Sequence, residues 1–289
     1  MGEIIHLNGR LLSAGEAGID PSDQGFLYGA GLFETMRAYS GCIFLLDRHI
    51  NRLLSSAQAI GVENIEAAKL DEACRSVVAA NGLHNARVRL TVSRGKSKLF
   101  PAAWGQPTVL AQAQPFMPPP PEKYRLGYRT KVSRVRRYSG SPLVRHKTTS
   151  YLECLLARTQ VEAESYDEAM FLNERGNLAE GSTSNLFLVS SNETLRTPPL
   201  GAGLLPGITR QFVLEIAGKL GMEAVEKDIC PEGLVDFHEA FVTSSLIEIM
   251  PLASITDENG REYSFKVGEA TEMLRRAYQE AIETAAGKE

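Results

Sequence analysis

Four consecutive prolines, Pro118 to Pro121, lie near the middle of the 289-residue chain. Proline fixes φ and has no backbone N–H, so such a run cannot extend a helix or a sheet and favours a stiff, extended spacer. A chain of this length can form two modest domains. The sequence therefore predicts a small N-terminal domain over residues 1–114, a proline-rich linker over 115–122, and a larger C-terminal domain over 123–289.

The residues before the linker show a hairpin and two helices. An Asn-Gly pair separates two apolar runs within residues 3–13, which is a strong hairpin signal. A helix is expected over residues 47–60, where Asp47 can cap the first turn, and its apolar residues recur at helical spacing. A second helix is expected over residues 67–81.

Residues 86–95 alternate between apolar and polar types, as a half-buried strand does. One face of this strand is expected to point to the core, and it carries Val88, Leu90 and Val92. Arg87 and Arg89 then share the other face. A row of arginines on a sheet is usually solvated, but a guanidinium also matches a carboxylate in fork geometry.

The second half of the chain interleaves strands and helices irregularly. A strand is expected over residues 124–137 and a helix over 148–163, with Leu152, Leu155, Leu156 and Thr159 on one face. Further strands are expected over 168–173 and 185–190. Strand candidates outnumber helices, which favours an α+β fold with an antiparallel or mixed sheet over a doubly wound nucleotide-binding fold.

Composition and charge exclude several classes of protein. The formal net charge of −4 argues against a general nucleic-acid binder. The first residues lack the basic region and apolar run of a secretion signal, and no apolar run is long enough to span a membrane. Four dispersed cysteines without a CxxC pair support neither a metal site nor a disulfide framework. The expectation is a cytoplasmic, reduced protein that does not bind nucleic acid, membranes or metals.

Three stretches of the second half combine residues that suit a single phosphorylated ligand. Lys147 lies in a polar segment, and Glu180 precedes a Gly-Ser-Thr-Ser loop. A helix is expected to open just after Pro206-Gly207, where Ile208 and Thr209 would present unpaired backbone N–H groups to an anion. Each residue alone also has an ordinary interpretation, such as a solvated lysine or a turn glutamate.

Four residues of the first half allow two interpretations. Arg52 lies beside the apolar face of its helix, and on pattern alone it is an ordinary helical arginine with its charged group in water. The glycine-rich stretch around Tyr28 is either a connection without chemistry or the start of a strand. In the second case, Tyr28, Thr35 and Arg37 face a site.

Taken together, these motifs resemble the class IV, fold-type IV, pyridoxal-phosphate aminotransferases. The resemblance covers nearly the whole chain. Its carriers, in chain order, are residues 28–34 (Tyr-Gly-Ala-Gly-Leu-Phe-Glu), 49–53 (His-Ile-Asn-Arg-Leu), Lys147, 180–187 (Glu-Gly-Ser-Thr-Ser-Asn-Leu-Phe), 204–210 (Leu-Leu-Pro-Gly-Ile-Thr-Arg) and 242–245 (Val-Thr-Ser-Ser). The fold it implies is a two-domain, D-amino-acid aminotransferase-like enzyme with a small α/β domain and a larger domain built on a mixed, barrel-like sheet.

The resemblance implies pyridoxal 5′-phosphate as the cofactor. Lys147 would form a Schiff base with its aldehyde and move the substrate proton, and Glu180 would keep the ring nitrogen protonated. Tyr151 is similar to a tyrosine that hydrogen-bonds the phenolic oxygen, although a core tyrosine fits equally well. The phosphate would be held by Arg52, Ile208, Thr209, Ser244 and Ser245.

Two reactions of this family compete for the chain. One is amino transfer between an α-amino acid, branched-chain or similar, and a 2-oxo acid. The other is the 4-amino-4-deoxychorismate lyase reaction, which releases pyruvate and 4-aminobenzoate, and Thr35 matches a threonine given a catalytic role in that branch. Arg37 and Arg89 are the candidates for binding the substrate carboxylate, with Arg94 and Arg137 behind them.

Other branches of the family fit less well. D-amino-acid enzymes carry an Arg-x-His carboxylate trap after the strand, where this chain has Lys98-Leu99-Phe100. An R-selective amine transaminase, or a binding protein that has lost its activity, is also less well supported. The resemblance further implies a homodimer, in which residues near Arg89 to Arg94 reach the partner's site.

Overall fold

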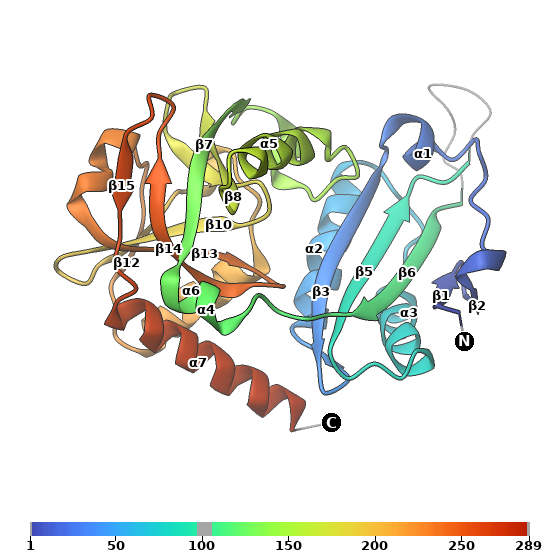
Figure 1. Ribbon diagram of the computed structural model, residues 1–289. Coiled ribbons are helices and arrows are strands. Elements are labelled where there is room, and N and C mark those ends of the chain that lie inside the picture. Colours follow the sequence, from blue (N-terminus) through green and yellow to red (C-terminus); the bar gives the residue numbers. More distant parts are fainter. Residues whose placement is uncertain (1, 97–105, 288–289) are drawn as a thin grey trace. The chain divides into compact units, whose positions relative to one another are not determined.

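The computed structural model describes residues 2–96 and 106–287, and the chain divides into two compact units (Figure 1). The first unit consists of Met1–Met117, His146–Ser150 and Ile282–Glu289, and the second consists of Pro118–Arg145 and Tyr151–Ala281. The sequence predicted one domain for everything after residue 122. The segment around Lys147 instead groups with the first unit, because its backbone pairs with a strand there.

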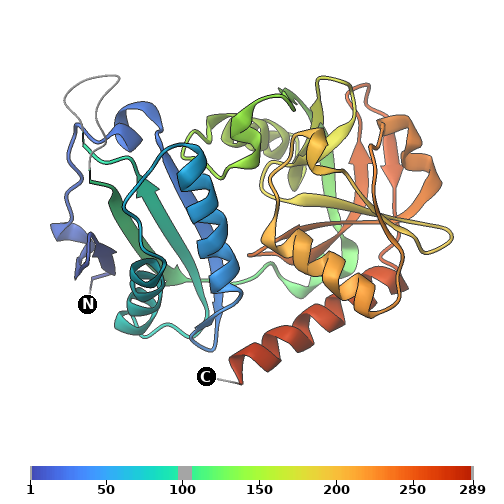
Figure 2. The same ribbon diagram turned by 180° about the vertical axis from the view of Figure 1, so that it is seen from behind.

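The first unit contains an antiparallel sheet with the strand order β2-β1-β6-β5-β3-β4. These strands are β1 (Ile4–Leu7), β2 (Arg10–Ser13), β3 (Gly31–Tyr39), β4 (Cys42–Ile43), β5 (Ala86–Ser93) and β6 (Thr108–Pro115). The helices α2 (Leu46–Ala59) and α3 (Ala67–Ala80) cover one face of the sheet, as the opposite views of Figures 1 and 2 show. Two short helices, η1 (Ala14–Glu16) and α1 (Gln24–Tyr28), lie between β2 and β3.

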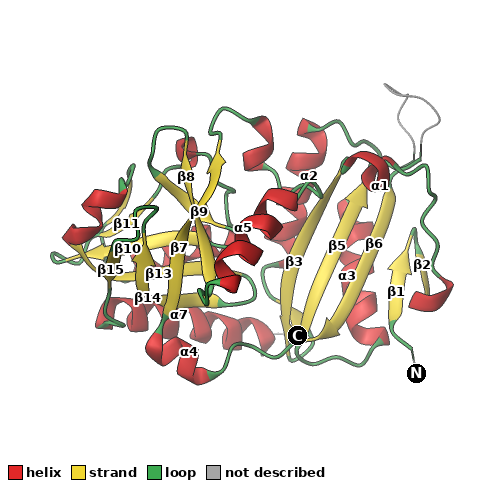
Figure 3. Cartoon of the chain, turned by 45° about the horizontal axis from the view of Figure 1, so that its top comes forward, coloured by secondary structure: helices red, strands yellow, loops and turns green. Residues whose placement is uncertain are grey.

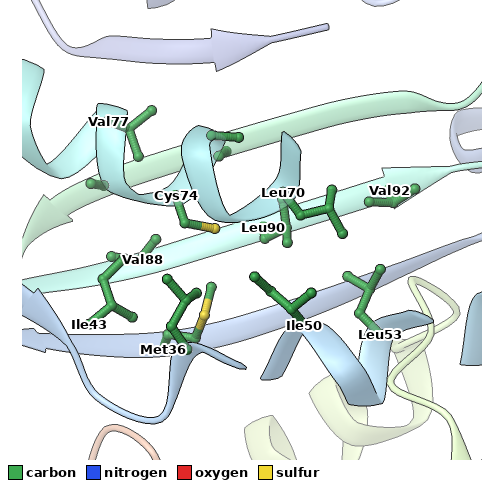
Figure 4. Close-up of a cluster of buried hydrophobic side chains, with 14 of the residues drawn as sticks. Met36, Ile43, Ile50, Leu53, Leu70, Cys74, Val77, Val88, Leu90 and Val92 are labelled. Atoms are coloured by element: carbon green, nitrogen blue, oxygen red, sulfur yellow. The ribbon is translucent and has the colours of Figure 1, made fainter. Parts of the chain in front are cut away.

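The core of the first unit lies between this sheet and its two helices. Val88, Leu90 and Val92 are fully buried, which confirms the face predicted for this strand. Figure 4 shows them with Leu70 and Cys74 of α3 and with residues of α2 and β3. Each fully buried aliphatic side chain contributes about 1.5–3 kcal/mol, so this cluster holds the sheet and helices together.

The predicted hairpin over residues 3–13 is confirmed, but the start of α2 differs from the prediction. The helix begins at Leu46, and the residue before it, Leu45, has a left-handed conformation (φ 56°) and makes no side-chain cap. Asp47 therefore lies within the first turn of the helix. There its negative charge interacts favourably with the helix dipole, and it does not cap a backbone N–H.

The second unit is built on a nine-stranded mixed sheet, shown in Figure 3. Parallel pairs (β7 with β8 and with β14) lie beside antiparallel ones (β10 with β13, β13 with β14). The strands are β7 (Tyr128–Arg137), β8 (Glu168–Asn173), β9 (Leu178–Gly181), β10 (Asn185–Ser190), β11 (Leu195–Thr197), β12 (Ala224–Glu226), β13 (Phe237–Ser244), β14 (Glu248–Thr256) and β15 (Glu262–Ser264). The predicted α+β class with a mixed sheet is confirmed.

The helices beside this sheet are α4 (Pro121–Leu126), α5 (Leu152–Ala163), α6 (Ile208–Lys219) and α7 (Glu269–Ala286), with the short helices η2 (Pro142–Arg145), η3 (Leu200–Ala202) and η4 (Pro231–Asp236). The helix α4 was not predicted. It begins at the last proline of the run, because proline is tolerated in the first turn of a helix. The strand expected from residue 124 therefore begins only at Tyr128.

The face of α5 that carries the leucines is not the one that packs against the sheet. Leu152, Leu155 and Leu156 are at least half exposed. The buried residues of α5 are Cys154, Ala157 and Val161, which pack with Ala169 and Phe171 of β8. Small residues and a cysteine form the inner face of this helix.

Candidate functional site

Lys147 lies on a segment that adds to the edge of β3. The backbone N–H of Phe33 donates to the Lys147 carbonyl (2.8 Å), and that of Thr149 donates to Gly31 (2.9 Å). The Lys147 Nζ lies 4.8 Å from the centre of the Phe33 ring. The preceding residue, His146, is 3.0 Å from the Ser56 hydroxyl of α2. The lysine backbone is thus fixed on both sides by the first unit.

Next to this edge, Glu34, His49 and Arg52 form a buried cluster between β3 and α2. The Arg52 Nε and Nη2 atoms donate to the two carboxylate oxygens of Glu34 at 2.8 and 2.5 Å. The His49 Nδ1 is 2.7 Å from Glu34 Oε2. The side chains of Glu34, His49 and Arg52 are 1%, 2% and 11% exposed. The charges of Glu34 and Arg52 therefore interact strongly, because little water screens them.

The charges of this cluster follow from its surroundings. Burial alone would raise the pKa of Glu34, but the charge of Arg52 and the hydrogen bonds from His49 and Arg52 outweigh it and lower the pKa to about 2. Burial lowers the pKa of His49, and the charges of Arg52 and Lys147 add to this effect against the opposing pull of Glu34. At neutral pH the cluster therefore holds an ionised glutamate, a neutral histidine and a charged arginine.

The face of β3 that points away from the helices carries Thr35 and Arg37. Thr35 is opposite Arg89 in the β3–β5 register, and the Arg89 guanidinium lies 3.9 Å from the centre of the Phe33 ring. The structure therefore brings Thr35 and Arg89 to the region of Lys147. Arg37 is 8% exposed and stacks on Tyr39 and Phe116 at 4.4 and 5.1 Å.

Tyr28 and Arg94 lie near the glycine-rich end of β3. Tyr28 is the last residue of α1 and is 59% exposed. The backbone N–H of Arg94 donates to Ala30 (3.0 Å). Residues 98–100, which bear on the D-amino-acid branch, lie outside the described residues.

In the second unit, Glu180 is 5% exposed near the end of β9. Its Oε2 accepts hydrogen bonds from the backbone N–H of Leu205 (3.1 Å) and from the Asn185 amide (3.4 Å). Its Oε1 lies 3.4 Å from the Arg137 guanidinium. The carboxyl group is thus held in one orientation by two hydrogen bonds and one ion pair.

Arg137 lies against Glu180, in a place that was not foreseen from the sequence. The same guanidinium donates to the Cys154 sulfur (3.1 Å) and lies 4.5 Å from the centre of the Phe171 ring. The Tyr151 hydroxyl donates to the Ser182 carbonyl (2.7 Å), and burial raises the pKa of this tyrosine. Tyr151 and Arg137 therefore frame Glu180 from within the second unit.

The helix α6 begins immediately after Gly207, which provides no side-chain cap. A Cβ at this position would lie 1.9 Å from the Asn185 amide oxygen, so the close approach of the chain requires glycine. Ile208 and Thr209 form the first turn and are buried. Their N–H groups have no acceptor within the helix and can serve an anion. Ser244 ends β13, and Ser245 follows it.

A second buried carboxylate, Glu168, organises the loop that follows Glu180. It begins β8 and is 1% exposed. Its oxygens accept from the hydroxyl groups of Ser182, Thr183 and Ser184 and from the backbone N–H groups of Ser182 (3.2 Å) and Ala169 (3.0 Å). Arg158 lies 3.4 Å away. Glu168 was not predicted from the sequence, although a charged residue at the head of an apolar strand was a usable signal.

Residues 31–255 match the family model described as amino-transferase class IV. This chain belongs to the class IV aminotransferase family. The match covers both units, from β3 of the first to β14 of the second. It confirms the predicted family and shows that the chain is a pyridoxal-phosphate-dependent enzyme, either a transaminase or a lyase.

Two relatives of this class IV aminotransferase align over nearly its full length. An aminodeoxychorismate lyase of Bacillus subtilis is 36% identical over 284 residues, which cover 96% of this chain and 94% of the relative. A putative branched-chain-amino-acid aminotransferase of Methanocaldococcus jannaschii is 34% identical over 283 residues, with coverages of 96% and 95%. The relatives thus include both reactions that compete on the sequence motifs.

Solved structures show the same fold. The branched-chain aminotransferase of Thermoproteus uzoniensis with norvaline superposes with a TM-score of 0.88 at 33% identity, covering 98% of this chain and 96% of the other. A T.th. branched-chain aminotransferase with pyridoxamine 5′-phosphate gives 0.87 at 28% identity, with coverages of 99% and 95%. These matches confirm the fold-type IV architecture and the predicted cofactor class.

The described part of the chain also bears on membranes and metals. No helix within residues 2–96 and 106–287 is long and apolar enough to cross a membrane. The same residues contain no cluster of three or more histidine, cysteine or acidic side chains placed to hold a metal ion.

Proposed function

We propose that this enzyme transfers the amino group between an α-amino acid, branched-chain or similar, and a 2-oxo acid. The observation that carries the proposal is the placement of Lys147 in the first unit, where its backbone is locked to β3 and its amine lies over Phe33. The relatives and solved structures named as branched-chain aminotransferases support it.

The residues fit pyridoxal phosphate by their chemistry. Glu180 is a buried carboxyl group with a fixed orientation, which suits an acceptor for a protonated ring nitrogen. The first turn of α6 after Gly207, whose backbone N–H groups have no acceptor within the helix, suits a phosphate. When bound, the cofactor supplies a ring that withdraws electrons from the substrate α-carbon and makes its proton removable.

We assign roles to the side chains on this basis. Lys147 is proposed to bond to the cofactor and to move the α-proton, and Glu180 to hold the ring nitrogen. Tyr151 is proposed for the phenolic oxygen. The remaining proposed cofactor contacts are to the phosphate, by Arg52, Ile208, Thr209, Ser244 and Ser245.

The substrate carboxylate needs a cation close to the reacting lysine. Arg89 meets this requirement, because its guanidinium shares the Phe33 ring with the Lys147 amine. Arg37 is the second candidate on the same strand face, with Arg94 behind it. Tyr28 and Thr35 are proposed to line the substrate position.

The test is the substitution Lys147→Ala, with the exposed Lys69→Ala as the matched control. Loss of Lys147 should reduce turnover by at least about 100-fold, because a positioned acid–base group contributes roughly that much or more. Borohydride reduction followed by mass spectrometry should locate the cofactor on Lys147 in the parent protein. Full activity of the Lys147→Ala variant would refute the assignment.

The second candidate function is the 4-amino-4-deoxychorismate lyase reaction. It is favoured by the Bacillus subtilis relative and by the position of Thr35 directly opposite Arg89. One assay separates the two functions. Branched-chain amino acids with 2-oxoglutarate should yield glutamate if the enzyme is a transaminase, whereas aminodeoxychorismate should yield pyruvate and 4-aminobenzoate if it is a lyase.

We also propose a homodimer as the active form. The exposed leucines of α5 at positions 152, 155 and 156 support it, because a single exposed apolar residue is common but a stripe of three is a typical contact surface. Light scattering of the active protein at assay concentration measures the mass directly. An active monomer would overturn this proposal.

A further inference from the structure

Glu34 grips Arg52 through two parallel hydrogen bonds, from Nε at 2.8 Å and from Nη2 at 2.5 Å. Such a bidentate contact fixes the plane of the guanidinium as well as its position. Two of the five N–H bonds of Arg52 point at Glu34, so the directions of the other three are set by the carboxylate. A long side chain on a helix surface would otherwise sample several rotamers.

The carboxylate of Glu34, which orients Arg52, is itself held rigidly. Glu34 lies in the middle of β3, whose backbone is paired with β5 from Gly31 to Ala38, and it points toward α2. His49, one helical turn before Arg52, lies 2.7 Å from the same oxygen that Nη2 contacts. Glu34 therefore transmits the rigidity of the sheet to the end of a flexible side chain.

The charge of Glu34 works against anion binding. A carboxylate within hydrogen-bonding distance of Arg52 reduces the positive potential that a phosphate would meet. If charge alone governed the site, removal of this carboxylate would tighten phosphate binding. If orientation governs it, removal would weaken binding. The sign of the effect therefore separates the two explanations.

We propose that Glu34 is a positioning residue for the cofactor phosphate, acting by aiming the Arg52 guanidinium. This inference rests on the proposed role of Arg52 in binding that phosphate. It deepens that role by naming the group that orients the Arg52 guanidinium, and it assigns a function to the buried Glu34.

The experiment compares pyridoxal 5′-phosphate with pyridoxal, which lacks the phosphate. Dissociation constants for both are measured by titration of the cofactor-free protein, for the parent and for Glu34→Gln. The variant should bind pyridoxal phosphate about 10-fold or more weakly and pyridoxal within about 2-fold of the parent. The double variant Glu34→Gln/Arg52→Lys should be no weaker than Arg52→Lys alone, because lysine lacks the fork that Glu34 orients.

Two further variants keep the test decisive. Glu34→Asp retains the charge but withdraws the carboxylate by one methylene, so it should also lose affinity for pyridoxal phosphate selectively, even if the glutamine variant fails to fold. Glu168→Gln, a buried carboxylate of the second unit, should change both affinities by the same factor. Thermal denaturation of each cofactor-free variant checks that it is folded.

The outcomes are distinct. Folded Glu34 variants that bind pyridoxal phosphate as tightly as the parent, or more tightly, would overturn the positioning role. An equal loss of affinity for pyridoxal and its phosphate would do the same, since the effect would then be structural. A parent protein that shows no preference for the phosphorylated cofactor would instead refute the proposed role of Arg52.

Discussion

Each unit of the molecule buries a glutamate almost completely, but the two are stabilised in different ways. Glu34 and Glu168 are both 1% exposed. In the first unit, Glu34 faces a guanidinium and an imidazole. In the second unit, Glu168 faces three hydroxyl groups and two backbone N–H groups, with Arg158 at a longer 3.4 Å. The same residue type thus relies on charge in one unit and mainly on neutral dipoles in the other.

The difference determines what each glutamate can do. A carboxylate paired with a cation fixes that cation, and this is the role proposed for Glu34. A carboxylate surrounded by hydroxyl and N–H donors instead fixes the chain segment that carries these donors. Glu168 does this for the loop between Glu180 and β10, whose hydroxyl groups donate to it. A buried carboxylate whose hydrogen bonds are all satisfied fixes the conformation of the loop that supplies the donors.

The largest effect is expected for Glu34→Gln. Whichever way the amide is turned, its NH2 group meets an N–H of Arg52, and the arginine loses its counter-charge. Removing one partner of a buried ion pair typically costs about 3–5 kcal/mol. We expect a loss near the lower figure, about 3 kcal/mol, measured by urea unfolding of the cofactor-free protein at pH 7. A loss below about 1 kcal/mol would show that charge pairing is not what stabilises this glutamate.

The free energy of unfolding should depend on pH in the acid range because of the ion pair between Glu34 and Arg52. The pKa of Glu34 is lowered from its usual 4.5 to about 2 in the folded protein. The resulting stabilisation is present above pH 4.5 and is lost as the pH falls through about 2, because the unfolded chain takes up the proton first. The shift corresponds to at most about 3 kcal/mol.

The control for this pH effect is the difference between two proteins. The free energy of unfolding of the parent minus that of Glu34→Gln should shrink as the pH falls from about 5 toward 2. This subtraction removes the contributions of all other acidic groups that titrate alike in both proteins. A difference that stays constant over this range would contradict the assignment of a charged Glu34.

A smaller loss, about 1–2 kcal/mol, is expected for Glu168→Gln at pH 7. Hydroxyl groups both donate and accept, so Ser182, Thr183 and Ser184 can turn to meet the amide, which a guanidinium cannot do. Urea unfolding beside Glu34→Gln measures the comparison. If Glu168→Gln lowers the free energy of unfolding more than Glu34→Gln does, then the loop depends on the charge of Glu168 and not only on its hydrogen bonds.

Part of the fold and of the candidate site could be predicted from the sequence. The helical spacing of the apolar residues within 47–60 and the strand pattern of residues 86–95 placed α2 and β5 correctly, because local periodicity decides which face is buried. The motif around Glu180 also stood out, since short polar loops between strands are conspicuous.

The features that the sequence did not reveal depend on contacts between distant segments. Glu34 pairs with residues 15 and 18 positions away in the chain, and Glu168 with a loop 14 to 16 positions away. The pairing of the Lys147 segment with β3 links residues more than 100 positions apart. Nothing in a periodic pattern encodes such pairings.

The smallest effect is expected for Glu66→Gln on the surface of the first unit. Glu66 contacts Lys69 at 2.6 Å, nearly the same distance as between Glu34 and Arg52, but both side chains are more than 60% exposed. Water screens the charges and the flexible side chains lose little by parting, so such pairs contribute about 0–1 kcal/mol. We expect a loss of less than about 0.5 kcal/mol in the free energy of unfolding, measured by urea unfolding. If Glu66→Gln cost as much as Glu34→Gln, contact distance rather than burial would control the strength of these pairs, and the distinction between the buried glutamates would lose its physical basis.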